Sequence, residues 1–243
     1  MDNVNIVKIS NGIKDFDFFY KQLGSRAVLG HIFSGEPYPV LPFVKKEHVR
    51  TIVDIGAHIG EAAFFFHFIY PGANIFSFEP DPESFGLLMR NVGQLGKVRS
   101  FHMGCFDCDK EVAFFKSMEF GSVGNSIHIK PNMTPSCMVQ LRDTATVLKE
   151  LAVPQSVDIM KIDTEGCEVA VLNSLVKGGY RSRLVYIEHH SERDCHDIHK
   201  ILFPTHVLWQ SSSIGCDHGV PGELLYIDRQ YLSDLATHTD QGG

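Results

Sequence analysis

The chain has 243 residues, of which 44% are hydrophobic, and its formal net charge is −7. This length suffices for one α/β domain with a sizeable core, so we expect a single main domain. The negative balance provides no basic stripe for phosphate backbones and argues against a nucleic-acid partner.

Hydropathy and cysteine usage indicate the compartment. No apolar run reaches the roughly 18 to 20 residues that a membrane-spanning helix needs, and the strongest run, residues 62–70, is interrupted by His67. The six cysteines have no framework spacing, so we expect reduced thiols and a soluble, cytoplasmic protein without membrane insertion. Cys105 and Cys108 form a CxxC pair, which we interpret as structural rather than as redox-active or half of a zinc site. The oligomeric state is open, with a homodimer as one option.

The predicted elements begin with a cap. Apolar residues at helical spacing over 12–33 predict a helical cap, which we assign to residues 1–50 and which could cover a ligand. We assign the main domain to residues 51–230 and a tail to 231–243.

The main domain alternates strands and helices. Strands are expected near residues 51–55, 74–78, 98–103, 157–162, 183–188, 205–210 and 223–228. Helices are expected near residues 59–70, 82–95, 143–151, 167–177 and 194–202. This order predicts a Rossmann-like α/β fold, with a seven-stranded, mostly parallel, doubly wound sheet.

Residues 104–140 interrupt the alternation. An extra strand is expected at 111–115, followed by a Gly, Ser, Asn and Pro-rich stretch that is too long for a plain connection. The loop over 116–140 is either a functional lid or locally mobile, and we favour a substrate-facing lid.

The segment VDIGAHIG, residues 53–60, joins a buried strand to a tight turn. Gly56, Ala57 and Gly60 have little or no Cβ, so the backbone there can approach a ligand before a helix begins. The carboxylate of Asp54 would repel a pyrophosphate but could bind an ammonium group directly or through water. The turn therefore favours a zwitterionic ligand.

A second acidic position follows in FSFEPDPE, residues 76–83. Glu79 stands at the tip of the expected second strand, where a carboxylate can accept two hydrogen bonds from a ribose diol. Asp54 and Glu79 together suggest an adenosine with an amino-acid tail, which is S-adenosylmethionine. The alternative is an ordinary glycine turn and a solvated acid.

The segment MKIDTEGCEVAVL, residues 160–172, resembles the hallmark of the FkbM-type methyltransferases. A buried strand there runs into Lys161, Ile162, Asp163, Glu165, Gly166 and Glu168, and a helix follows. The similarity covers roughly residues 50–230, including LVYIEHH at 184–190. It departs at QLRDTATVL, residues 140–148, which keeps only Asp143 and Thr144 of the family's usual run.

This resemblance implies the class I methyltransferase fold and S-adenosylmethionine as cofactor. The cofactor-binding residues that follow from the motifs and the resemblance are Asp54, Gly56, Ala57, His58, Gly60, Glu79, Pro80, Cys105, Phe106, Asp107, Asn125 and Ser126. The resemblance also implies O-methylation of a small molecule, such as a sugar, polyketide, peptide or other secondary metabolite.

Catalytic candidates stand at the carboxyl ends of the fourth and fifth strands, where open α/β sheets bind ligands. Asp163 and Glu165 follow the fourth strand, and Glu188 and His189 follow the fifth. Methyl transfer to a hydroxyl needs an aligned nucleophile and removal of its proton, and His189 is a plausible base. Alternatively, Asp163 with Glu188 or His189 holds a divalent cation. We favour the metal-free version.

Several residues near these candidates have a plainer interpretation. Glu168 is expected to cap the following helix, and capping is also the alternative role of Asp163 and Glu165. The remaining acidic and histidine side chains of this region are expected on a solvated helix face, namely His190, Asp194, His196 and His199.

Two other function classes stay open. A nicotinamide-dependent oxidoreductase is disfavoured because the turn reads GAHIG rather than GxGxxG and because Asp54 would face a pyrophosphate. A non-catalytic cofactor-binding module would not need the groups around Asp163 and His189. The sequence carries no readable code for the methyl acceptor.

Overall fold

The computed structural model describes residues 4–21, 23–117, 124–129, 132–212 and 222–239. Its main sheet has seven strands in the order β11-β12-β10-β9-β3-β4-β5. β12 runs antiparallel to both of its neighbours, and the other pairs are parallel. The predicted mostly parallel, doubly wound α/β fold is therefore confirmed. The strands are β3 (Thr51–Ile55), β4 (Asn74–Phe78), β5 (Val98–Phe101), β9 (Ser156–Ile162), β10 (Arg181–His189), β11 (His206–Ser211) and β12 (Gly222–Asp228).

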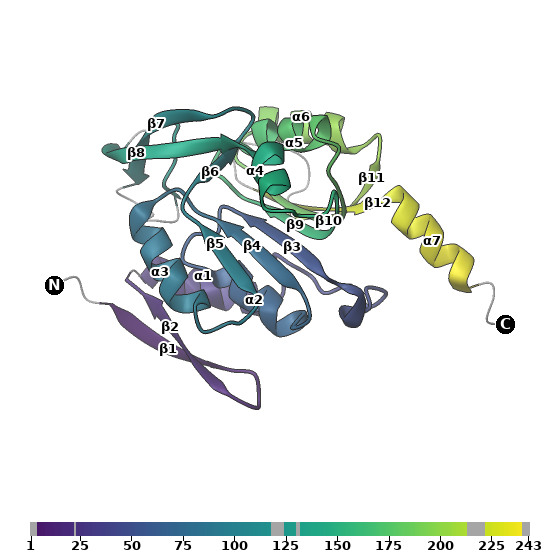
Figure 1. Cartoon of the computed structure of the whole chain (residues 1–243), viewed down its shortest axis with the longest axis horizontal. Helices are drawn as coiled ribbons and strands as arrows, with labels where there is room; N and C mark the ends of the chain where they lie inside the picture. Colours follow the sequence, from purple (N-terminus) through teal and green to yellow (C-terminus); the bar gives the residue numbers. More distant parts are fainter. Residues whose placement is uncertain (1–3, 22, 118–123, 130–131, 213–221, 240–243) are drawn as a thin grey trace.

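Helices cover both faces of this sheet (Figure 1). One face packs on α1 (Leu23–Ser34), α2 (Glu61–Ile69) and α3 (Pro82–Val92). The other packs on α4 (Thr144–Glu150), α5 (Glu168–Lys177) and α6 (Glu192–Leu202). Strand β3, between β9 and β4, is consequently buried along its whole length, as expected for a parallel strand between two helical layers.

The N-terminal cap is only partly helical. It contains a β-hairpin of β1 (Asn5–Ser10) and β2 (Asp15–Tyr20), which precedes α1. The prediction of helix is wrong for β2, because Phe16, Phe18 and Tyr20 alternate with more exposed residues and have the two-residue period of a strand. The side chain of Asn91 on α3 bonds both the N–H and the carbonyl of Phe19, which fastens the hairpin to the domain.

Three strands between Gly104 and Asp143 form a second sheet. It contains β6 (Gly104–Phe106), β7 (Lys110–Ser117) and β8 (Met133–Asp143) in the order β6-β8-β7. The predicted extra strand is confirmed as β7. The predicted loop is wrong from Met133 onward, because β8 pairs with β7 from Ser117 opposite Met133 to Lys110 opposite Leu141. Residues 118–123 and 130–131 of the expected lid lie outside the described part of the chain.

Two short helices and the cysteines complete the fold. A 3₁₀ turn, η1 (Lys46–His48), precedes β3, and α7 (Arg229–Thr239) occupies most of the expected tail.

Cys195 is disulfide-bonded, so the expectation of reduced thiols is wrong for that residue, whereas Cys105, Cys108, Cys137 and Cys167 are free. Among the described helices, none is long and apolar enough to cross a bilayer.

Candidate functional site

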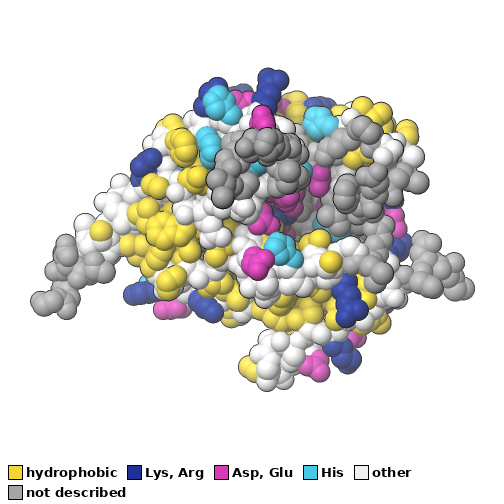
Figure 2. Space-filling model, turned by 180° about the vertical axis from the view of Figure 1, so that it is seen from behind, with side chains coloured by type: hydrophobic (Ala, Val, Ile, Leu, Met, Phe, Trp, Pro, Cys, Tyr) yellow, Lys and Arg dark blue, Asp and Glu magenta, His cyan; other side chains and the backbone are white. Residues whose placement is uncertain are grey.

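A cavity of about 370 Å³ lies at the carboxyl ends of β3, β4, β9 and β10. Val28, Ile32 and Tyr38, from α1 and the segment after it, form one wall, so the N-terminal cap does cover this site. Acidic side chains gather around a hollow in the middle of the face shown in Figure 2. The predicted site residues that line the cavity are Gly56, Ala57, His58, Glu79, Pro80, Cys105, Asn125, Asp163, Glu165 and Glu188.

The glycines of the first turn allow other segments of the protein, rather than a ligand, to approach closely. Gly56 has a left-handed φ of 78°, and a Cβ there would lie 1.6 Å from the carbonyl oxygen of Asp163. Gly60, at φ 100°, faces Leu88 and Val92 of α3, each 3.0 Å from a would-be Cβ. The turn therefore needs glycine because β9 and α3 approach it closely, and Gly60 does not line the cavity.

Asp54 points into the sheet and not into the cavity. Its side chain is fully buried, with Oδ1 3.6 Å from Nζ of Lys161 and Oδ2 accepting a hydrogen bond from Ser77 Oγ at 3.3 Å. Burial raises the pKa of the Asp54 carboxyl, and the Lys161 ammonium opposes that rise. Lys161 also donates to the carbonyl of Gly56 at 2.5 Å. Asp54 is thus not among the residues that line the cavity, and it contacts the turn through Lys161. Its interaction with a ligand ammonium, directly or through water, stays a prediction.

Glu79 stands at the end of β4 with its carboxylate on the cavity wall. One oxygen accepts the backbone N–H of His58 and the other that of Asp81, both at 2.8 Å. Burial raises the pKa of Glu79 to about 7, although both backbone bonds lower it. Each carboxylate oxygen retains a lone pair, so the group can still accept hydrogen bonds from a ribose diol.

Of the remaining predicted cofactor residues, some line the cavity and others lie behind its lining. Cys105 and Asn125 line the cavity, whereas Phe106, Asp107 and Ser126 do not. Ser126 donates its hydroxyl to the carbonyl of Glu165 at 2.7 Å. Ser126 therefore contributes to the site by holding Glu165, whose left-handed φ is 57°.

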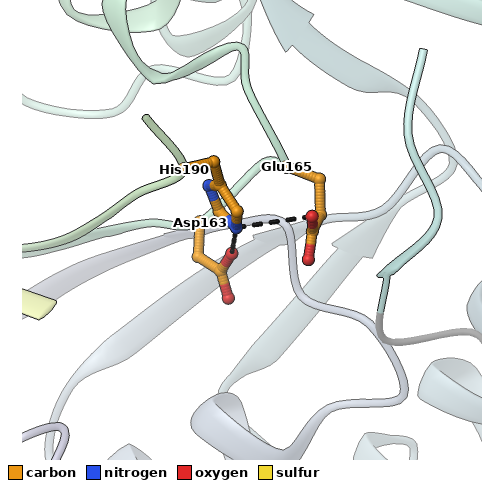
Figure 3. Close-up of side chains that lie close together, drawn as sticks. All are labelled: Asp163, Glu165 and His190. Carbon is orange, nitrogen blue, oxygen red and sulfur yellow. Dashed lines mark ion pairs between the residues drawn. The ribbon is translucent and has the colours of Figure 1, made fainter. Parts of the chain in front are cut away.

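The acidic end of the cavity is organised around His190 (Figure 3). His190 Nε2 lies 3.4 Å from Glu165 Oε2, 4.0 Å from Asp163 Oδ1 and 3.9 Å from Glu188 Oε1. On the other side of the ring, Nδ1 lies 3.2 Å from Oε1 of the buried Glu168. One imidazole thus contacts four carboxylates.

Two expectations about the adjacent histidines are wrong. His189, proposed as the base, is 2% exposed and does not line the cavity, and His190, expected in solvent, has a side chain that is only 6% exposed. The reason is strand alternation on β10, where Val185, Ile187 and His189 face the α5 and α6 layer. Glu188 consequently points to the opposite side. The two-residue period of the strand was the signal that could have revealed this.

The electrostatics of this cluster are strongly perturbed. Burial acts to lower the pKa of His190, but Glu165 and Glu168 raise it to about 11. Burial acts to raise the pKa of Glu168, but bonds from His190 and from the N–H of Gly166 lower it to about 2. Glu168 also accepts the N–H and hydroxyl of Thr164. Burial, Asp163 and Glu165 raise the pKa of Glu188 to about 8.

Within the described part of the chain, the group of three potential metal ligands differs from the set that the sequence suggested. Among the described residues, Asp163, Glu165 and His190 are the one group of three whose potential ligand atoms lie within 4.8 Å of one another. Sequence reasoning missed His190 and also the cavity residues Tyr38 and Glu223, which come from the cap and from β12. No motif in the sequence marks those last two.

The sequence has matches among known proteins. The family model described as the methyltransferase FkbM domain matches residues 54–207. The hexuronic acid methyltransferase AglP of Haloferax volcanii is 25% identical over 157 residues, which is 64% of this chain and 62% of AglP. The 2-O-methyltransferase NoeI of Sinorhizobium fredii is 26% identical over 152 residues, or 57% of this chain and 63% of NoeI. The match spans less than two thirds of each relative.

Solved structures agree on the fold. Aeropyrum pernix fibrillarin with bound S-adenosyl-L-methionine superimposes with a TM-score of 0.51 at 11% identity, over 92% of this chain and 82% of that one. Methanococcus jannaschii fibrillarin gives a TM-score of 0.52 at 12% identity, over 93% and 83% of the two chains. At this level of identity the likeness extends to the fold alone.

Proposed function

Because the chain belongs to the FkbM methyltransferase domain family, we propose that its cavity binds S-adenosylmethionine and that the protein methylates a hydroxyl of a small molecule. The observation that carries the proposal is a single cavity that joins Glu79, at the end of β4, to Asp163, Glu165 and Glu188. The names of the relatives, a hexuronic acid methyltransferase and a 2-O-methyltransferase, favour a sugar hydroxyl as the acceptor.

The residues present fit this cofactor. Glu79 offers buried carboxylate oxygens for a ribose diol beside the backbone of Ala57 and His58. The acidic end of the cavity has more carboxylates than cations, which favours a positively charged sulfonium. When bound, the cofactor supplies an electrophilic methyl group on that sulfonium.

Glu188 takes the role of general base in this proposal. It lines the cavity on the same side as Asp163, and its raised pKa of about 8 keeps it basic enough to accept a hydroxyl proton. The acceptor oxygen would attack the methyl carbon in line with the breaking carbon–sulfur bond, and its proton would move to Glu188. His189 is excluded from this step by its burial away from the cavity.

Calorimetric titration tests the cofactor assignment. The wild-type protein should bind S-adenosylmethionine and not NAD. Glu79→Gln should weaken the binding by about 2 to 3 kcal/mol, the scale of hydrogen bonds to a charged acceptor. The matched control is Glu83→Gln, because Glu83 pairs with Lys21 and Lys116 outside the cavity. Preferential binding of NAD, or equal affinity of the two variants, would refute the assignment.

The pH dependence of binding gives a second check. The folded pKa of Glu79 without ligand is about 7, and the ribose hydroxyls donate to the charged form. Affinity should therefore fall as the pH is lowered through 7 and level off above it. In Glu79→Gln this dependence should disappear.

A further inference from the structure

A second cavity of about 360 Å³ adjoins the first and is lined by polar and charged residues. Its walls are formed by His31, Glu36, Glu188, Gln210, Ser212 and Glu223. Three of these, His31, Glu188 and Glu223, also line the cofactor cavity. Glu188 therefore stands on the wall that the two cavities share.

Contacts between α1, the segment after it and β12 connect the walls of this cavity. The ring of His31 on α1 lies 3.3 Å from Glu36 Oε2 and 3.5 Å from Glu223 Oε1 on β12. The side chain of Ser212 accepts the N–H of Glu223 at 2.8 Å, and the N–H of Ser212 donates to the Glu223 carbonyl at 2.9 Å. The cap and the antiparallel edge of the sheet thus form one preorganised surface.

We propose that this cavity is the acceptor site and that it selects a neutral or amine-bearing polyhydroxylated ring over one that carries a carboxylate or phosphate. The inference rests on the proposed function and goes beyond it by defining the charge class of the acceptor. Three carboxylates, one amide and one hydroxyl offer acceptors for sugar hydroxyls, and no Lys or Arg is among the lining residues of the described chain.

The charges exclude an anionic ring for a physical reason. An acceptor carboxylate would lie beside the carboxylates of Glu36 and Glu223, which line this cavity without a Lys or Arg among the described lining residues. A protonated amine would offset their negative charge, and a uronate would increase it. This chain therefore differs in acceptor from its relative that is named for hexuronic acid.

Binding of three matched sugars tests the proposal. The protein, saturated with S-adenosylhomocysteine, is titrated at pH 7 and low salt with methyl glucoside, methyl glucosaminide and methyl glucuronide. The glucosaminide should bind at least tenfold more tightly than the glucuronide, and the glucoside should fall between them. Added salt should narrow the difference.

Variants connect the preference to this cavity. Glu223→Gln and the more exposed Glu36→Gln should each reduce the ratio of glucosaminide to glucuronide affinity several-fold. The control Glu47→Gln, on the surface of η1, should leave the ratio unchanged. Equal or tighter binding of the glucuronide, an unchanged ratio in both variants, or no binding of any of the three sugars would overturn the proposal. Failure of S-adenosylhomocysteine itself to bind would count against the proposed function instead.

Discussion

Lys161 and Asp54 form an ion pair inside the sheet, with Nζ 3.6 Å from Oδ1. The two residues belong to the two most informative motifs of the sequence, on neighbouring strands β9 and β3. Lys161 also binds the carbonyl of Gly56, so the pair holds the turn that borders the cavity. The segments 53–60 and 160–172 are therefore joined by a buried ion pair, and both also border the cavity.

Lys161→Met should be strongly destabilising. The change leaves the fully buried Asp54 carboxylate without its main counter-charge, and loss of one partner of a buried pair costs about 3 to 5 kcal/mol. Urea denaturation measures the loss. The double variant Asp54→Leu/Lys161→Met should recover part of it, and the exposed Lys177→Met is the control. A loss below about 1 kcal/mol would show that the pair contributes little.

Gly56→Ala and Gly12→Ala separate backbone strain from steric clash. The two glycines have nearly equal φ values, 78° and 82°, but only at Gly56 would a Cβ collide with backbone, and at Gly12 nothing lies within 4 Å. Gly12→Ala should cost about 1 to 2 kcal/mol of left-handed strain. Gly56→Ala should cost clearly more and abolish cofactor binding, as measured by denaturation and calorimetry. Equal losses of stability in the two variants would mean that the backbone at Asp163 can move away from the new Cβ at little cost.

The rate of methyl transfer should depend on the protonation of Glu188. A general base acts only when deprotonated, so kcat should rise about tenfold per pH unit below the raised pKa of about 8 and level off above it. Glu223→Gln removes a charge that raises this pKa, so its midpoint should move to lower pH. Rates measured from pH 6 to 10 give both midpoints. A flat profile would exclude Glu188 as the base.

Glu168 should contribute to acid stability. Its pKa is about 2 in the fold, below the ordinary value of 4.5, so it stabilises the protein fully above about pH 4.5 and loses this effect as the pH falls towards 2. The shift corresponds to about 3 kcal/mol. Glu168→Gln should lose roughly that amount at pH 7 and show a shallower decline in acid, whereas the exposed Glu111→Gln should behave as wild type. Parallel acid profiles of Glu168→Gln and wild type would contradict this role.

Chelation should leave turnover intact. The raised pKa of His190, about 11, makes the ring a cation among Asp163, Glu165, Glu168 and Glu188, so it neutralises part of their charge without a metal. Activity is measured after dialysis against EDTA and again after addition of Mg²⁺. Loss of activity that Mg²⁺ restores would instead assign Asp163, Glu165 and His190 as ligands.

Much of the fold was predictable because its signals are local. Apolar runs predict the strands β3, β4 and β9, and glycine predicts the turn after Ile55. Neither prediction depends on the tertiary contacts of these segments. The motif at residues 160–172 also predicted the family, and Asp163 and Glu165 do stand on the cavity wall. The hairpin strand β2 was missed because its phenylalanines match helical and strand spacing at once.

Only the tertiary structure decided which side chains meet. The neighbour that requires glycine at position 56 is the carbonyl of Asp163, far along the chain, and the partner of Asp54 is Lys161 on the adjacent strand. Whether His189 or His190 joins the acids depends on which face of β10 is turned to the cavity. His31 and Glu223 line the same wall because the fold brings α1 close to the first residues of β12, where the two side chains are in contact. Sequence periodicity determines elements, whereas strand register and packing between distant elements determine the orientation of each side chain at the site.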